Sequence, residues 1–395
     1  MIIPPHSAGE DKERQAMKEL QYFMDIVNVQ ENALVKDWQK EGGKVIGYIC
    51  PNVPEEIIMA AGALPYRLRP RESKDTSEGD RYTTYLCCTF CRHLADEGVR
   101  GKFDFLDGFI GTNACDQIRR SSDFFRVVAF KDGKNGKDYF KDYIATPRLP
   151  LEDFSHKYYR EELDRMRDGL EKFFKVKITD DKLKEAIKLT NESRRLLHQL
   201  YDLRKAEKPP ITGAEALYVT VAYTCMPKAI FNTKLKELLK ALEGRVIPKF
   251  KRRLFLYGSE LDDPEWVKVI EDAGGLIVAD GLCYGAKLFW DLVDEKKPPM
   301  QALTDRYLER WSCPRMAKDF DRRMGVIKEI MKDWKADGLV GERVIMCQLW
   351  AGERAMTNMA TRDADIPSLW LEREYLLGSV GQMKTRVQAF LESFQ

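Results

Sequence analysis

Apolar and polar positions alternate in blocks along this chain, and the blocks predict short buried strands separated by helices. Apolar residues recur with the helical period of 3.6 within residues 11–41, which predicts a helix. Short apolar runs bounded by glycine, proline or charged residues follow, and such runs are typical of buried strands. The predicted strands are 44–50, 62–68, 105–111, 126–130, 253–258, 275–280, 343–347 and 366–372.

This alternation predicts an α/β protein with two Rossmann-like (flavodoxin-like) parallel-sheet domains. The stretch between the two groups of strands is dominated by a charged helical pattern, which is interrupted by Pro209 and Pro210. The predicted units are an N-terminal helical arm at 1–40, a first α/β domain at 41–150, a helical connector at 151–250 and a second α/β domain at 251–395.

Four cysteines share one kind of position. Cys50, Cys115, Cys283 and Cys347 each end or closely follow a predicted strand. Ligand sites of open α/β sheets lie beyond the carboxyl ends of the strands. We therefore expect thiols from both domains to converge on one cleft.

Composition narrows the class of protein. The 395 residues include 65 Lys and Arg and 63 Asp and Glu, a net charge of +2, with 44% hydrophobic residues. This balance is typical of a globular protein, and it excludes nucleic-acid binding through bulk charge and a polybasic membrane arm. No apolar run is long enough to cross a membrane, and the first residues lack the pattern of a signal peptide. We expect a cytoplasmic protein with reduced thiols.

The densest cysteine group is Cys87, Cys88 and Cys91, at a predicted helix start where thiols become more acidic. Three chemistries compete for these cysteines and Cys115: a thioredoxin-like dithiol, a structural zinc site and iron–sulfur ligation. Simple packing is the fourth alternative. The four histidines show no paired metal-ligand spacing, so any bound metal is expected to have sulfur ligands.

Nucleotide-binding signatures are missing. The sequence contains no G-x-x-x-x-G-K-[ST] loop, and no G-x-G-x-x-G follows a predicted strand. We expect that the chain itself binds neither ATP nor a dinucleotide.

Several separated motifs carry a family resemblance. These motifs are IGYICPNVPEEIIMAAGALPYRLRP at 46–70, CCTFCR at 87–92, LDGFIGTNACDQIRR at 106–120 and the C-terminal run that begins VIMCQLWAGERAM at 344–356. They resemble subunits of 2-hydroxyacyl-CoA dehydratases and ATP-dependent benzoyl-CoA reductases. The resemblance covers roughly residues 35–395.

The resemblance implies two homologous subunits, each with a 4Fe–4S cluster in the cleft between its domains and an acyl-CoA thioester near one cluster. The three cluster ligands fall on Cys88, Cys115 and Cys347. It also implies a separate ATP-hydrolysing iron–sulfur activator that supplies electrons one at a time. An external energy source is reasonable, because iron–sulfur potentials extend only to about −700 mV.

The chain has more cysteines than a three-thiolate cluster needs. One branch of this superfamily, the double-cubane cluster proteins, joins two cubanes through a bridging sulfide and needs about twice as many thiolates. The resemblance therefore suggests an 8Fe–9S cluster with additional ligands, with packing as the alternative. The candidates, in order, are Cys91, Cys50, Cys283 and Cys313.

Two residues are candidates for proton transfer. Glu55 follows Pro54 at a predicted helix start, where helix capping or a surface position is the alternative role. His93 lies two residues beyond Cys91, where a helix-surface position is the alternative.

The resemblance thus implies an enzyme: an iron–sulfur subunit of a benzoyl-CoA-type reductase that adds low-potential electrons to an aromatic acyl-CoA through radical intermediates. It would work with a homologous subunit or a second copy. One alternative is a 2-hydroxyacyl-CoA dehydratase subunit, a lyase that eliminates water through a ketyl radical. Another is a homodimeric double-cubane reductase of small molecules. A zinc-stabilised, non-catalytic subunit is the alternative from a different class.

Overall fold

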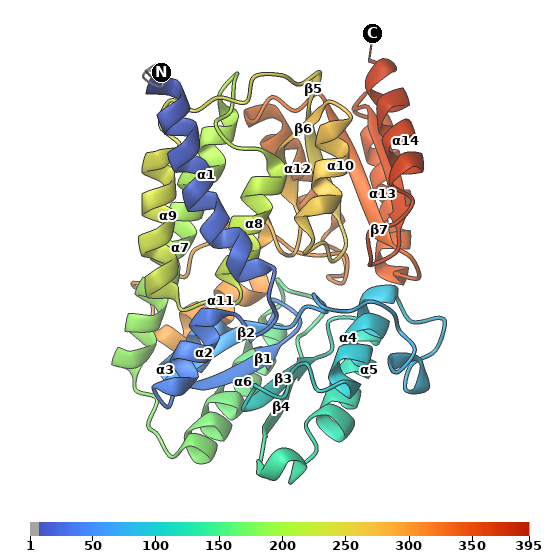
Figure 1. Ribbon diagram of the computed structural model, residues 1–395. Coiled ribbons are helices and arrows are strands. Elements are labelled where there is room, and N and C mark those ends of the chain that lie inside the picture. Colours follow the sequence, from blue (N-terminus) through green and yellow to red (C-terminus); the bar gives the residue numbers. More distant parts are fainter. Residues whose placement is uncertain (1–7, 395) are drawn as a thin grey trace.

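The computed structural model describes residues 8–394 and contains two four-stranded sheets, both entirely parallel (Figure 1). The strand orders are β2-β1-β3-β4 and β6-β5-β7-β8, so the two halves repeat one topology. The strands are β1 (Lys44–Tyr48), β2 (Ala63–Arg67), β3 (Gly108–Thr112), β4 (Phe140–Ile144), β5 (Arg252–Gly258), β6 (Gly275–Gly281), β7 (Gly338–Val344) and β8 (Ser368–Arg373). The predicted α/β class with two parallel sheets is confirmed.

Helices surround both sheets, and α1, α7, α8 and α9 lie together in one layer at the left of Figure 1. The first seven residues of the predicted N-terminal arm lie outside the described residues. Within residues 8–394, no helix combines the length and apolar character needed to cross a lipid bilayer. The helices are α1 (Ala8–Val27), α2 (Ala33–Lys40), α3 (Glu55–Ala60), α4 (Thr89–Val99), α5 (Asp116–Phe124), α6 (Asp153–Phe174), α7 (Asp180–Asp202), α8 (Gly213–Tyr223), α9 (Lys228–Ala241), α10 (Pro264–Asp272), α11 (Pro299–Glu309), α12 (Phe320–Asp333), α13 (Gln348–Arg362) and α14 (Val380–Glu392).

The two halves of the chain interlock. Helix α11 belongs to the C-terminal half, yet its Leu303 and Tyr307 share a buried core with Ile46 of β1 and Ile110 of β3. Burying such side chains provides the main favourable term in folding, so α11 contributes to the stability of the first sheet. The boundaries of the four predicted units stay a prediction.

The predicted strand at 126–130 is wrong. Residues Phe125–Ala129 form a π-helical turn that continues α5, and the fourth strand is β4 instead. The apolar, β-branched run suggested a strand, but no glycine or proline separates it from α5, so the chain remains helical. Val127 is 70% exposed, which no buried strand would allow.

Strand β7 begins five residues before the predicted strand at 343–347 and ends at Val344. Charged residues inside the strand hid it from a search for apolar runs. Glu342 is buried because Arg373 Nε lies 2.7 Å from one carboxylate oxygen and Ser259 Oγ donates to the same group. A buried carboxylate is tolerated where such partners satisfy it.

Glu97 in α4 is a buried carboxyl group of a different kind. It is 1% exposed, and neither carboxyl oxygen has a hydrogen-bond partner. Burial raises its pKa from 4.5 to about 8. Its contribution to stability is therefore fully present below pH 4.5, where both folded and unfolded chains are protonated. It is lost as the pH rises through 8, because folding then requires a buried charge.

We predict that Glu97→Gln leaves the free energy of unfolding unchanged near pH 4.5 and raises it at pH 9 by on the order of 1–3 kcal/mol. Urea unfolding at both pH values measures this difference. Glu72→Gln is the matched control, because Lys102 lies 2.7 Å from Glu72 and lowers its pKa. The control should gain no stability at pH 9. A Glu97 variant less stable than wild type at pH 9 would contradict the assignment.

Candidate functional site

Cysteines from both halves of the chain line a single cavity. Its lining also contains Ser259, Glu260 and Trp350. All nine cysteines are free, so no disulfide competes for these thiols. The structure brings together Cys50, Cys88, Cys115, Cys283, Cys313 and Cys347.

Sheet topology places most of these thiols. Cys50 follows β1, Cys115 follows β3, Cys283 follows β6 and Cys347 follows β7. In each sheet the strand order reverses direction between the two central strands, and ligands bind at the carboxyl ends beside such a point. Two sheets of the same topology therefore present their ligand-binding edges to one cavity. The sixth thiol, Cys313, lies on the loop after α11.

Three cysteines occupy the same local position, the residue directly before a helix. Cys88 caps α4, Cys115 caps α5 and Cys347 caps α13. Cys115 Sγ accepts from the backbone N–H of Ile118 at 3.4 Å. The N-terminus of a helix carries partial positive charge, so each of these positions favours an anionic sulfur or an anionic group bound to it.

Burial opposes ionisation of these thiols when no metal is bound. It raises the pKa of Cys50 to about 11 and that of Cys347 to about 12, and it raises the pKa of Cys115 as well. Thiolate is the form that binds metal, and a coordinated thiol loses its proton outright. The cavity therefore holds neutral thiols that a metal can convert to ligands.

The donor set fits an iron–sulfur cluster better than a single zinc ion. Zinc–sulfur bonds of about 2.3 Å in a tetrahedron place the sulfurs about 4 Å apart. Within the described residues no three cysteine sulfurs lie within 4.8 Å of one another. A cluster places its own iron and sulfide between the cysteines, and it takes thiolates from separated loops. No histidine lines the cavity.

The remaining cysteines do not line the cavity, but the thiols of Cys87 and Cys91 are hydrogen-bond neighbours of the Cys88 thiol. Cys91, the first additional ligand proposed from the sequence, is fully buried in α4 and does not line the cavity. Cys87 lines a separate hollow with Arg120. Cys225 is buried in the loop after α8, where its Sγ lies 3.7 Å from the carbonyl oxygen of Val221. A packing role accounts for Cys225.

Arg67, at the end of β2, connects the loops that carry the cysteines. It is fully buried. Its Nε donates to the carbonyl of Ile49 at 2.7 Å, and its Nη1 donates to the carbonyl of Cys283 at 2.7 Å. Its Nη2 lies 2.9 Å from Glu260 in the cavity lining. The planar guanidinium thus fixes backbone from both halves of the chain at once. The sequence analysis missed this residue.

Arg315 fixes the loop of Cys313 in a similar way. It is 5% exposed, and its Nε and Nη1 donate to the carbonyls of Asn113 at 3.0 Å and Pro147 at 2.7 Å. Arg315 also lines an adjoining cavity with the exposed Arg148. The two cavities share Cys88, Cys115 and Cys347. This side offers a positively charged approach to those three thiols.

Glu55 and Glu56 form a buried ionic network instead of a helix surface. They are 4% and 0% exposed. The Tyr223 hydroxyl donates to Glu55, Lys228 Nζ lies 3.0 Å from Glu55, and Arg194 Nη2 lies 2.6 Å from Glu56. Arg194 holds the pKa of Glu56 below its usual value against the opposing effect of burial. Glu55 does not line the cysteine cavity, and its role in proton transfer stays a prediction.

His93 is buried, not on a helix surface. It is 6% exposed, and its Nδ1 lies 2.7 Å from Ser73 Oγ. Its ring also packs against Tyr375, with the ring centres 5.2 Å apart. Burial lowers the pKa of His93. His93 does not line the cavity either, and its role as a proton donor likewise stays a prediction.

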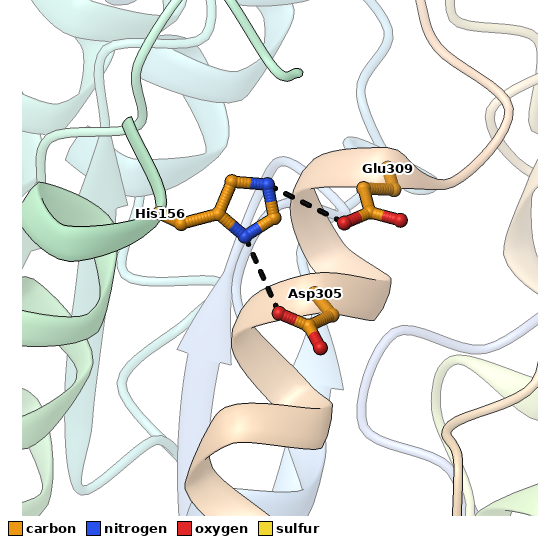
Figure 2. A group of neighbouring side chains, drawn as sticks. All are labelled: His156, Asp305 and Glu309. Atoms are coloured by element: carbon orange, nitrogen blue, oxygen red, sulfur yellow. Dashed lines mark hydrogen bonds and ion pairs between the residues drawn. The ribbon is translucent and has the colours of Figure 1, made fainter. Parts of the chain in front are cut away.

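A group outside the cavity joins α6 to α11. Figure 2 shows His156 between Asp305 and Glu309, with Nδ1 3.3 Å from Asp305 and Nε2 3.4 Å from Glu309. The three residues offer ligand atoms within 4.8 Å of one another. However, each ring nitrogen faces a different carboxylate, and Lys297 already lies 2.6 Å from Asp305. This geometry fits a link between two helices. Only the i, i+4 spacing of the two acids was visible in the sequence.

Comparison with known proteins adds a family relationship. The family model described as "2-hydroxyglutaryl-CoA dehydratase, D-component" matches residues 50–394. A benzoyl-CoA reductase subunit of Thauera aromatica is 27% identical over 359 residues, covering 89% of this chain and 91% of the relative. The (R)-phenyllactyl-CoA dehydratase beta subunit of Clostridium sporogenes is 24% identical over 374 residues, covering 94% and 97%. The beta subunit of (R)-2-hydroxyglutaryl-CoA dehydratase of Acidaminococcus fermentans is 25% identical, covering 93% and 97%. The relatives include a reductase and dehydratases, so they indicate an enzyme but not its class.

We predict that Arg67→Met lowers the free energy of unfolding by about 3–5 kcal/mol, because it leaves Glu260 and two backbone carbonyls without their donor. Urea unfolding of the metal-free protein measures the effect. Arg71→Met is the matched control, since the Arg71 pair with Asp263 at 3.3 Å is partly exposed and should contribute at most about 1 kcal/mol. Equal losses in the two variants would contradict a central role for Arg67.

Proposed function

The chain belongs to the 2-hydroxyglutaryl-CoA dehydratase D-component family, and on that premise we propose that it is an iron–sulfur subunit of an ATP-dependent reductase. The observation that carries this proposal is the set of six cysteines lining one cavity. Three of them, Cys88, Cys115 and Cys347, suffice for one cubane. Cys50, Cys283 and Cys313 would supply the second half of an 8Fe–9S cluster. Such a cluster, when bound, supplies low-potential electrons one at a time.

The chain's own residues prepare this cavity for an anionic group. Helix N-termini at Cys88, Cys115 and Cys347 favour negative charge there. Arg67 and Arg315 hold the cysteine loops through backbone carbonyls, so the donors keep their positions before any metal binds. Preorganisation of this kind reduces the reorganisation that accompanies electron transfer.

Partners follow from the same proposal. Relatives named as subunits support pairing with a homologous chain, either a different subunit or a second copy. The sequence lacks a phosphate-binding loop, so a separate ATP-hydrolysing iron–sulfur activator would supply the energy for reduction.

The adjoining cavity beside Arg148 is the proposed entry for the substrate, because it opens onto three of the thiols. An aromatic acyl-CoA thioester is the first substrate to test, since a benzoyl-CoA reductase subunit is among the relatives. A small molecule is the second. Six thiolates imply a large cluster that would fill the inner cavity, so that only the adjoining cavity would remain for the substrate.

A dehydratase subunit is the second candidate function. The observation that favours it is that Cys88, Cys115 and Cys347 share the position directly before a helix and would make a three-thiolate set without the others. In that case Cys50, Cys283 and Cys313 would not bind iron and would have a packing role around the rest of the cavity.

Metal analysis tests the cluster. We predict about eight irons per chain, with acid-labile sulfide, in protein purified without oxygen. Cys115→Ser and Cys347→Ser should lose the iron of the first cubane, and Cys283→Ser and Cys313→Ser should each lose about half of the total. Cys225→Ser is the matched control and should keep all of it. About four irons, unaffected by Cys283→Ser, would favour the dehydratase, and zinc without sulfide would overturn both candidates.

Turnover with the activator tests the reaction class. A reductase consumes reductant and ATP in every cycle, whereas a dehydratase recycles its electron and needs only an initiating one. We therefore predict that ATP hydrolysed rises in proportion to product over many turnovers. The measurement follows phosphate release and product together. Product that accumulates without further ATP would identify the dehydratase instead.

A further inference from the structure

Lys287 is a buried cation behind the cysteine cavity. It lies in the 3-10 turn Ala286–Leu288, which follows Cys283 and strand β6. It is 3% exposed, and its Nζ has no hydrogen-bond partner. Three aromatic rings enclose the Nζ atom, with centres 5.1 Å away for Tyr257, 5.5 Å for Trp311 and 5.2 Å for Trp350. Trp350 also lines the cysteine cavity, so the ammonium group and the cavity share this side chain.

The charged groups around Lys287 do not neutralise it. Glu353 is the carboxylate of this region, but Arg323 donates to both of its oxygens at 3.0 and 2.9 Å. Tyr257 donates to the same carboxylate at 2.6 Å. Arg310 adds a further cation, which approaches the Lys287 carbonyl. Aromatic faces attract a cation but leave its N–H donors unsatisfied, so the ammonium group lacks a counter-ion.

Two of the cavity cysteines can supply the missing negative charge. Negative charge on Cys283 or Cys313 would stabilise the Lys287 ammonium group, which burial alone disfavours. Both cysteines are among those that a three-thiolate cluster does not need.

We propose that the Lys287 ammonium group is the counter-ion of Cys283 and Cys313 when these residues are thiolates bound to iron. The inference rests on the proposed six-thiolate cluster and adds a role for a residue that is not a ligand. Lys287 is a positioning residue in this role, because it acts on the cluster through charge and not through contact with substrate.

The direction of its effect follows from electrostatics. Reduction adds negative charge to the cluster, and a cation in a water-poor region stabilises that charge strongly. Lys287 therefore raises the reduction potential of the iron held by Cys283 and Cys313. Electron transfer from an activator to iron bound there would then be more favourable.

The reduction potential tests the proposal. In Lys287→Met, one-electron reduction should become less favourable by about tenfold, which corresponds to a shift of 59 mV toward negative potential. An EPR-monitored redox titration of the iron-loaded protein measures it. Lys287→Arg keeps the charge and should restore the wild-type potential. Lys268→Met removes an exposed lysine and should leave the potential unchanged. An unchanged potential in Lys287→Met would overturn the proposal.

Thermal unfolding provides a second test, which does not require an electron. Removing an unpaired buried cation should leave the melting temperature of the iron-free protein unchanged or higher. In the iron-loaded protein the same variant should lower it, because the thiolates lose their counter-ion. Equal losses with and without iron would show that Lys287 only fills space between the rings, and would overturn the proposal.

Iron content separates this inference from the proposed function. About four irons per chain in wild type, retained in Cys283→Ser, would remove the thiolates that Lys287 is meant to neutralise and would overturn both. About eight irons per chain, together with a wild-type potential in Lys287→Met, would overturn the role of Lys287 alone.

Discussion

The guanidinium group of Arg67 is the interaction on which the cavity depends. It is fully buried, and it donates to the backbone beside Cys50 and to the backbone of Cys283, residues more than two hundred positions apart in the sequence. Its third partner is Glu260, which lines the cavity. A buried arginine is costly unless all its donors are used, so the two loops and the carboxylate must keep this arrangement for the fold to be stable.

Positively charged groups and helix N-termini surround the thiols of the cavity. Three helices begin directly after Cys88, Cys115 and Cys347. Arg315 lies on the loop of Cys313, and Lys287 lies in the turn that follows Cys283. The nearby carboxylates do not balance this positive charge, because they already have partners, as Glu342 has Arg373. A cavity with this excess of positive potential is unfavourable when its thiols are neutral and favourable when they are anionic. Metal binding therefore also creates the thiolate charges that compensate the positive groups around the cavity.

The sequence revealed the placement of cysteines but not the groups that hold them. Cys50, Cys115, Cys283 and Cys347 could be placed because parallel strands bring their carboxyl ends to one edge, a rule that needs only strand positions. Arg67 could not, because an arginine inside an apolar run shows no local sign of its partners. The strand predicted at 126–130 failed because the apolar run alone does not distinguish a strand from the end of a helix. Cys313 and α11 belong to the C-terminal half but lie against residues of the N-terminal half, and only tertiary packing shows this.

The repeated strand order has a consequence for stability. Cys115 follows β3 and Cys347 follows β7, which occupy equivalent places in the two sheets, so equivalent thiols face one cavity from opposite halves. A ligand held by both would cross-link the halves in the folded state and not in the unfolded state, and such a ligand stabilises the fold by mass action. Without it, the halves are held together by their own buried contacts, among them those of Arg67, Arg315 and α11. The buried contacts between the halves therefore keep the cysteine cavity in place in the metal-free protein.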